Sequence, residues 1–379
     1  AQVFLVQSPA IAMVDVQIDF DAGSRRDPAD KAGLASVTAM MLSKGINGKG
    51  ANGSNAALDD NQLSEAWADL GASFSAGAGA DRMSFSLRSL TYPDLLGKAV
   101  DLAARQMGHP AWPNTIWLRE RERIAASIKE ANTRPATLAG RAFNQAVYGA
   151  HPYGFETMET NLAAISVADM QVAYTALVLP CRAKVSIVGA VTKPQADALV
   201  AKLLGQLPKS ECSLLQVIPE VEPLKQAEDR RISFESAQAH VLIGQPGYKR
   251  DDPDFFALLV GNHILGGGGF TSRLTHEVRE KRGLTYGVYS GFQPGNHAGA
   301  FTLGLQTRPD QAAQALQVFP LFAIAHAIEL MLRMAAGGIF PGFWSFLAPF
   351  LEALLWPLAS WVLLAPQRRP PDRDENRPL

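Results

Sequence analysis

The sequence contains an internal repeat, and this repeat constrains the fold more than any other feature of the chain. Three phrases recur in the same order: residues 19–28 are echoed by 243–253, residues 65–77 by 277–291, and residues 91–94 by 307–310. Self-similarity in a fixed order indicates a repeated structural unit, so we infer an internal duplication. The predicted unit runs strand, helix, helix, strand, strand, helix.

Hydrophobic periodicity places the first copy and its boundaries. Alternating apolar and polar residues predict strands at 3–7 and 13–20, joined by a turn at Ser8-Pro9. Residues 208–226 are rich in Pro, Glu and Lys and lack periodicity, which is typical of a linker. We therefore expect a first domain over 1–207, a linker at 208–226 and a second domain over 227–319.

Composition excludes some classes of partner. With 379 residues, the chain is long enough for two or three domains. Its 35 basic and 36 acidic residues nearly cancel, so bulk charge predicts neither a nucleic acid nor an anionic membrane surface as partner. Cys181 and Cys212 could pair in an oxidising compartment. Two thiols in so long a chain are more often unpaired, and these two match no metal-binding spacing.

Residues 33–45 read G-L-A-S-V-T-A-M-M-L-S-K-G. This frame resembles the zinc helix of the pitrilysin/insulinase peptidases, in which the run reads G-L-A-H-F-L-E-H-M-L-F-K-G. The positions that match are Gly33, Leu34, Ala35, Met41, Leu42, Lys44 and Gly45. The three positions that carry the chemistry in the family hold Ser36, Ala39 and Met40 here.

Those three replacements remove the metal chemistry. In the family, two histidines one helical turn apart share a zinc ion, and the glutamate between them is the general base. Alanine and methionine offer no hard donor, and one serine cannot hold zinc. We therefore expect no metal and no cofactor in this chain, with zinc only in a partner subunit. An ordinary half-buried helix of small apolar residues would also explain the segment.

The second copy carries two further family features. Gly266, Gly267, Gly268 and Gly269 resemble the flexible glycine-rich loop that lies near the substrate path in the non-catalytic subunit of processing-peptidase-like heterodimers. Arg279 and Tyr286 match the family's Arg/Tyr pair, with the arginine expected on a helix and the tyrosine on the next strand. The resemblance implies that both stabilise an oxyanion on the substrate carbonyl. Arg282 is the neighbouring alternative to Arg279, and a surface arginine with a strand tyrosine is the simpler interpretation.

The tail differs from the rest of the chain. Residues 321–336 and 343–364 are almost wholly apolar, and the second run is about long enough to cross a bilayer. Residues 355–358, 363–369 and 374–379 resemble the carboxyl end of the rod shape-determining membrane protein MreD. We therefore expect the second half to be truncated and followed by an apolar helical hairpin and charged tail at 320–379, in contact with the inner membrane. A buried hairpin of a soluble domain is the alternative.

Together, these features predict an α+β fold with two pitrilysin-like halves built on antiparallel sheets. The expected function is that of a non-catalytic subunit of a two-chain zinc metallopeptidase in the bacterial periplasm. It would act on peptide substrates together with a homologous subunit that bears H-x-x-E-H. The alternatives are a membrane scaffold of the cell-elongation machinery, or a hybrid of two proteins joined near Phe319. We favour a hybrid origin, because Arg368-Arg369 suits the cytoplasm whereas the peptidase-like part belongs outside it.

Overall fold

The computed structural model describes residues 1–48 and 56–317. The expected hairpin and MreD-like tail at 320–379 lie outside this range, as does the point at which the second half is expected to stop. Within the described ranges, the structure contains no helix whose length and apolarity would suffice to cross a membrane.

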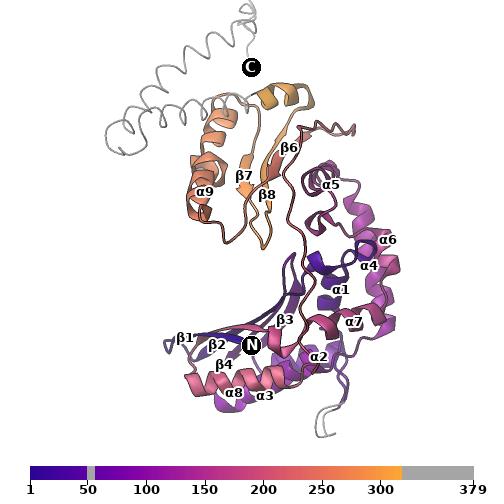
Figure 1. Ribbon diagram of the computed structural model, residues 1–379, viewed down its shortest axis with the longest axis vertical. Coiled ribbons are helices and arrows are strands. Elements are labelled where there is room, and N and C mark those ends of the chain that lie inside the picture. The colour runs from indigo at the N-terminus through magenta and orange to yellow at the C-terminus, as the bar shows by residue number, and fades with distance from the viewer. Residues whose placement is uncertain (49–55, 318–379) are drawn as a thin grey trace, which may run out of the picture. The chain divides into compact units, whose positions relative to one another are not determined.

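The first half is built on a five-stranded sheet with the order β1-β5-β2-β4-β3 (Figure 1). Its strands are β1 (Gln2–Gln7), β2 (Met13–Phe20), β3 (Ser73–Ala78), β4 (Met83–Leu90) and β5 (Lys184–Gly189). The hairpin expected between the first two strands is wrong, because β5 lies between them, parallel to β1 and antiparallel to β2. β1 and β2 are therefore two strand spacings apart, roughly 10 Å, and the short segment that joins them can cross this distance.

Helices cover one face of this sheet. In Figure 1, α3 (Pro93–Gly108) and α8 (Lys193–Gly205) lie along it, while α1 (Leu34–Met41) packs against β3 and α7 (Val167–Leu177). The inward residues of β2 and β4 are buried with these helices, whereas the polar residues between them face outward. The remaining helices of this half are α2 (Asp60–Asp69), α4 (Asn114–Ala131), α5 (Pro135–Tyr148) and α6 (Glu159–Ala164).

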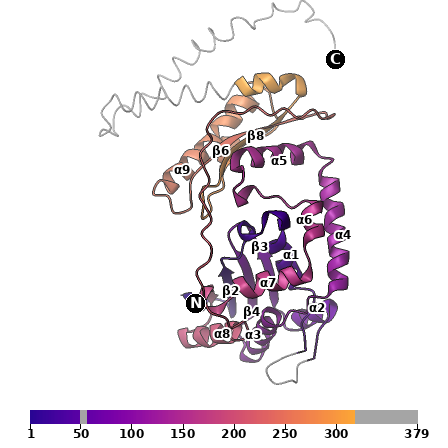
Figure 2. The same ribbon diagram turned by 45° about the vertical axis from the view of Figure 1, so that its right-hand side comes forward.

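The second half repeats the strand order of the first. Its sheet has the order β6-β8-β7, formed by β6 (Ala239–Pro246), β7 (Val288–Phe292) and β8 (Ala300–Thr307), and all its pairs are antiparallel. In both halves the third strand of the unit lies between the first and the second, as expected of two copies of one unit (β2-β4-β3 and β6-β8-β7). Helix α5 packs against β6 (Figure 2).

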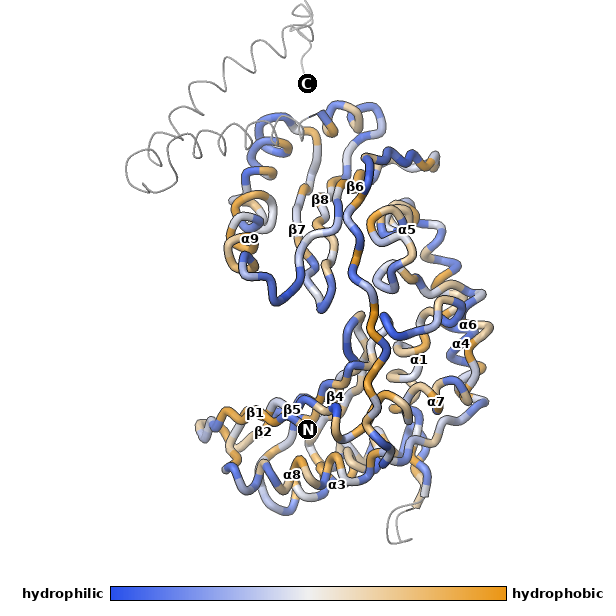
Figure 3. Tube along the Cα trace, in the orientation of Figure 1, coloured by the Kyte–Doolittle hydropathy of each residue, from blue (hydrophilic) through white to orange (hydrophobic). Residues whose placement is uncertain are grey.

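Helix α9 (Phe255–Asn262) of the second half is rich in apolar residues (Figure 3). Phe256 is 75% exposed and Val260 is 60% exposed, and Leu258 and Leu259 are exposed as well. By contrast, the largest buried apolar cluster lies wholly within the first half. The first half therefore holds the main core of the described residues.

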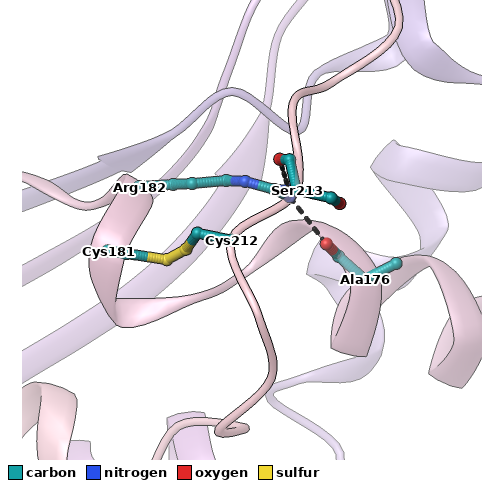
Figure 4. The surroundings of a disulfide bond; sticks show 5 residues. All are labelled: Ala176, Cys181, Arg182, Cys212 and Ser213. Carbon is teal, nitrogen blue, oxygen red and sulfur yellow. Dashed lines mark hydrogen bonds between the residues drawn. A yellow bond between two sulfur atoms is a disulfide. The ribbon is translucent and has the colours of Figure 1, made fainter.

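The two cysteines, whose state the sequence left open, are joined. Cys181 and Cys212 form a disulfide with their Cα atoms 6.5 Å apart, within the usual range (Figure 4). Beside it, the Arg182 guanidinium donates to the carbonyl oxygens of Ala176 and Ser213, both at 2.7 Å. These contacts fix the beginning of the linker to the first half.

The rest of the linker contains no helix or strand, yet side chains hold it at several points. Arg26 donates to the Gln216 carbonyl at 3.1 Å, and a ring nitrogen of His151 lies 3.0 Å from the Pro219 carbonyl. Glu220 forms an ion pair with Lys249 of the second half at 2.6 Å. The predicted linker is thus a fixed connection that contacts both halves.

A buried arginine joins groups from distant parts of the sequence. Arg25 is 7% exposed, and its guanidinium lies 2.7 Å from Asp21, 3.2 Å from Asp81 and 2.8 Å from Nε2 of His297. A guanidinium can only donate, so Nε2 of His297 accepts and the ring hydrogen is on Nδ1. Nδ1 in turn lies 3.2 Å from a carboxylate oxygen of Glu220.

Tyr153 completes this cluster. Its hydroxyl donates to Asp81 at 2.6 Å and accepts from the backbone N–H of His297 at 3.1 Å. The other oxygen of Asp81 accepts from the backbone N–H of Asn296 at 2.9 Å. The loop at residues 296–297 of the second half is therefore held by polar groups of the first.

Helix α1 is fixed at its N-terminus by a carboxylate from upstream. The two oxygens of Asp27 accept from the backbone N–H groups of Gly33 at 2.9 Å and Ala35 at 3.0 Å. These amides are among those that an α-helix leaves without a partner. Gly33 has a φ of +101°, and a Cβ there would lie 2.5 Å from the Thr157 hydroxyl, so this entry into the helix requires glycine.

The C-terminus of α1 is also held. The buried Gln106 side chain donates to the Leu42 carbonyl at 3.1 Å and accepts from the indole N–H of Trp67 at 2.9 Å. A side chain from α3, itself held by one from α2, therefore satisfies an unpaired carbonyl just beyond the last turn. The helix keeps a defined position although it carries none of the family's metal ligands.

We predict that removing the disulfide destabilises the protein. The crosslink joins residues 31 apart in sequence. For a loop of this length, the chain-entropy model gives roughly 3–4 kcal/mol. The double variant Cys181→Ser/Cys212→Ser should therefore unfold at lower urea concentration than oxidised wild type, as followed by tryptophan fluorescence. Dithiothreitol should bring the wild type to the midpoint of the variant and leave the variant unchanged. Two reactive thiols in the unfolded, unreduced wild type would contradict the prediction.

We also predict a pH-dependent contribution from Asp27. Burial raises the pKa of this carboxyl from 3.8 to about 6, although the backbone amides oppose the shift. Between these pH values the folded state holds a proton that the unfolded state releases, so the contribution of Asp27 to the free energy of unfolding falls as pH rises from about 4 to about 6. The free energy of unfolding of Asp27→Asn, relative to that of wild type, should therefore increase by on the order of 2–3 kcal/mol between pH 4 and pH 7.

Urea unfolding at the two pH values measures this change. Asp30→Asn, at an exposed position, is the matched control and should keep a constant difference from wild type. A difference between Asp27→Asn and wild type that does not change with pH would contradict the account.

Candidate functional site

The helix that corresponds to the family's zinc helix offers no metal site. On α1, Ser36 is exposed, Ala39 is buried and Met40 is half-buried. Zinc needs imidazole, thiolate or carboxylate ligands, so these three side chains do not fit it. Within residues 1–48 and 56–317, no group of three or more His, Cys, Asp or Glu residues could hold a metal ion. No catalytic step through zinc follows from the residues of this helix.

The family resemblance also implies a further zinc ligand on the helix that is α4 here. Glu122 and Glu130 on this helix are exposed. The buried acid is Glu120, which the sequence did not single out. It lies 2.8 Å from Arg123 and 3.5 Å from Lys44, in the loop after α1. The hydrogen bond from Arg123 and the charge of Lys44 lower its pKa, so Glu120 is an ionised carboxylate engaged by cations.

In the second half, the structure brings together the two features that the sequence predicted. Arg279 lies on a helical turn at Thr275–Glu280, and its Cζ is 4.9 Å from the centre of the Tyr286 ring. Tyr286 lies just before β7 rather than on the strand. Phe270, directly after the four glycines, places its ring centre 4.8 Å from the same Cζ. Phe270 was not predicted as a site residue, although an aromatic residue that ends a glycine run was a visible signal.

The acids near Arg279 are engaged by other residues. Glu277 lies 2.5 Å from Lys281 and 2.8 Å from Arg282. Glu280 lies 2.8 Å from a histidine one turn earlier. Within the described residues, no acid lies within 4.0 Å of the Arg279 guanidinium, so its donors are available to a ligand. Arg282, the alternative candidate, is instead bound to Glu277.

The four glycines form a turn that is closely packed at its first residue. Gly266 is buried, and a Cβ there would lie 2.5 Å from the Ser290 hydroxyl and 2.6 Å from its backbone nitrogen. Gly269 has a φ of +60°, and its carbonyl accepts from the hydroxyls of Ser272 at 2.7 Å and Thr275 at 2.9 Å. These contacts fix the backbone that presents Phe270.

The two sets of site residues are separate. No hydrogen bond, ion pair or ring contact among the described residues links Ser36, Ala39 or Met40 to Arg279 or Tyr286. The open face of the first sheet has a depression of about 340 Å³, and none of the predicted site residues lines it. Its lining includes charged groups that pair with each other, such as Arg88 and Asp15 at 2.6 Å.

Comparison with known proteins shows relatives of both halves. The family model for insulinase (peptidase family M16) matches residues 2–161, and that for the peptidase M16 inactive domain matches residues 164–322. The crystal structure of a peptidase M16 inactive domain from Pseudomonas fluorescens is 34% identical, with a TM-score of 0.78, over 83% of this chain and 74% of that one.

Two further proteins are similar at lower identity, the first of them in fold. A protease from Helicobacter pylori is 19% identical, with a TM-score of 0.70, over 85% of this chain and 76% of that one. The uncharacterized zinc protease YmxG of Bacillus subtilis is 23% identical over 316 residues, which are 83% of this chain and 73% of that protein. The relatives found give no support to the expected resemblance of the tail to MreD. The two family models and the similar inactive domain show that the chain belongs to the M16 (insulinase, or pitrilysin-like) peptidase family.

Proposed function

We propose that this chain is the non-catalytic subunit of a two-chain zinc peptidase. One observation carries the proposal: the Arg279–Tyr286 pair is assembled with its guanidinium free of acids, whereas the helix at the zinc position has no ligand. The match to a peptidase M16 inactive domain supports a non-catalytic role. The missing half of the active site would come from a homologous subunit that bears H-x-x-E-H.

The pair is suited to stabilising charge on a peptide carbonyl. The partner's zinc would supply a Lewis acid and an activated water. Arg279 would direct its N–H donors, and Tyr286 its hydroxyl, at the carbonyl oxygen as it becomes an oxyanion. Tyr286 is 85% exposed, so an approaching peptide can reach both groups. The packed turn at Gly266–Gly269 would border the path of that peptide.

We place this subunit in the bacterial periplasm, without a cofactor of its own. The disulfide between Cys181 and Cys212 supports an oxidising compartment, because such bonds seldom persist in the cytosol. The alternative function, a membrane scaffold of the cell-elongation machinery, depends only on residues 320–379. Those residues lie outside the described ranges, and no observation favours that function.

We predict that peptidase activity requires both chains and depends on Arg279. The chain should co-purify with its H-x-x-E-H-bearing homologue, and the complex should cleave a fluorogenic peptide that neither chain cleaves well alone. Arg279→Ala should lower kcat by about 10²–10³-fold, the usual effect of removing an oxyanion donor. Tyr286→Phe, which removes only the hydroxyl, should also lower kcat.

Arg250→Ala is the matched control, because Arg250 also lies over an aromatic ring of the second half, 4.4 Å from the centre of Phe255. It should leave kcat within about twofold of wild type. An active complex that is indifferent to Arg279→Ala, or a stable complex without peptidase activity, would overturn the proposal.

A further inference from the structure

Phe270 is an exposed aromatic residue with a defined contact. Its side chain is 73% exposed, so it contributes little to a core. Its ring centre nevertheless lies 4.8 Å from Cζ of Arg279, within the distance at which a cation is attracted to a ring face. The residue thus contacts one of the two groups to which we assign the proposed function.

The backbone, rather than the packing of the ring, fixes the position of Phe270. The residue belongs to a short helical turn, Gly269–Thr271, that follows the packed glycines. Thr271 donates to the Gly268 carbonyl at 2.9 Å, and the backbone N–H of Ser272 donates to the Gly269 carbonyl at 3.1 Å. Both hydrogen bonds join a residue after Phe270 to a residue before it, and they fix the backbone that holds the ring beside Arg279.

Arg279 needs such a contact, because the usual means of orienting an arginine is absent. A flexible arginine is commonly held by a bidentate carboxylate, but Glu277 and Glu280 are engaged by other residues. Two aromatic rings, each within 5 Å of Cζ, restrict the guanidinium without occupying its N–H donors. An acid partner would instead use donors that the oxyanion needs.

We infer that Phe270 is a positioning residue that orients the Arg279 guanidinium while leaving its donors free for the substrate carbonyl. This inference rests on the proposed function of Arg279 in the two-chain peptidase. It also gives the glycine run a purpose: a turn that admits no Cβ at Gly266 places an aromatic ring beside the arginine.

The test uses the reconstituted complex with a fluorogenic peptide. Phe270→Leu keeps an apolar side chain but removes the ring, and should lower kcat about two- to fivefold with KM changed less than twofold. Phe270→Trp keeps an aromatic face and should retain wild-type kcat. Phe256→Leu, which replaces a phenylalanine that is 75% exposed on α9, is the matched control and should leave kcat unchanged.

A double-mutant cycle distinguishes positioning from a general structural effect. In an Arg279→Ala background, Phe270→Leu should have no further effect, because the group that it orients is gone. Loss of kcat in that background, or a wild-type kcat for Phe270→Leu in an otherwise Arg279-dependent complex, would overturn the inference alone. An inactive wild-type complex would instead overturn the proposed function, and the inference with it.

Discussion

The described structure depends on one buried guanidinium. Arg25 is nearly inaccessible to water, and its partners Asp21, Asp81 and His297 come from three separate stretches of the chain. A buried charge that loses its partner is strongly destabilising, so this cluster ties the first half to the loop at residues 296–297. The linker joins the same cluster through Glu220. The disulfide and the Arg182 contacts then fix the end of the linker that leaves the first half.

The two candidate regions differ in how their charged groups are paired. Around α1, Asp27 holds the N-terminus of the helix, Gln106 holds its C-terminal end, and Lys44 engages the buried Glu120. Around Arg279, the nearby acids are engaged elsewhere and the guanidinium lies beside two exposed aromatic rings. The region around α1 has paired charges and no zinc ligands, whereas Arg279 has no acid partner among the described residues. That contrast supports a divided active site.

Local sequence pattern predicted the elements better than their long-range partners. The alternation at residues 13–20 gave β2 its observed bounds, and the repeated phrases anticipated the shared strand order of the two sheets. The pattern could not show that β5 enters between β1 and β2, because it carries no information on pairing across some 170 residues. The sequence named Cys181 and Cys212 as a possible pair but left their state open, and it did not show the contact between Phe270 and Arg279, because both depend on how nearby loops fold in three dimensions. The packing of Gly266 against Ser290 could not be predicted either, because it is visible only in three dimensions.

In the two-chain peptidase that we propose, this chain supplies an oxyanion site but no metal. The most direct measurement is the zinc content of the purified chain by mass spectrometry, made together with a peptidase assay of the same sample. The account predicts zinc far below one ion per chain and no hydrolysis of a fluorogenic peptide, before or after addition of zinc. One tightly bound zinc ion per chain together with peptidase activity would contradict it.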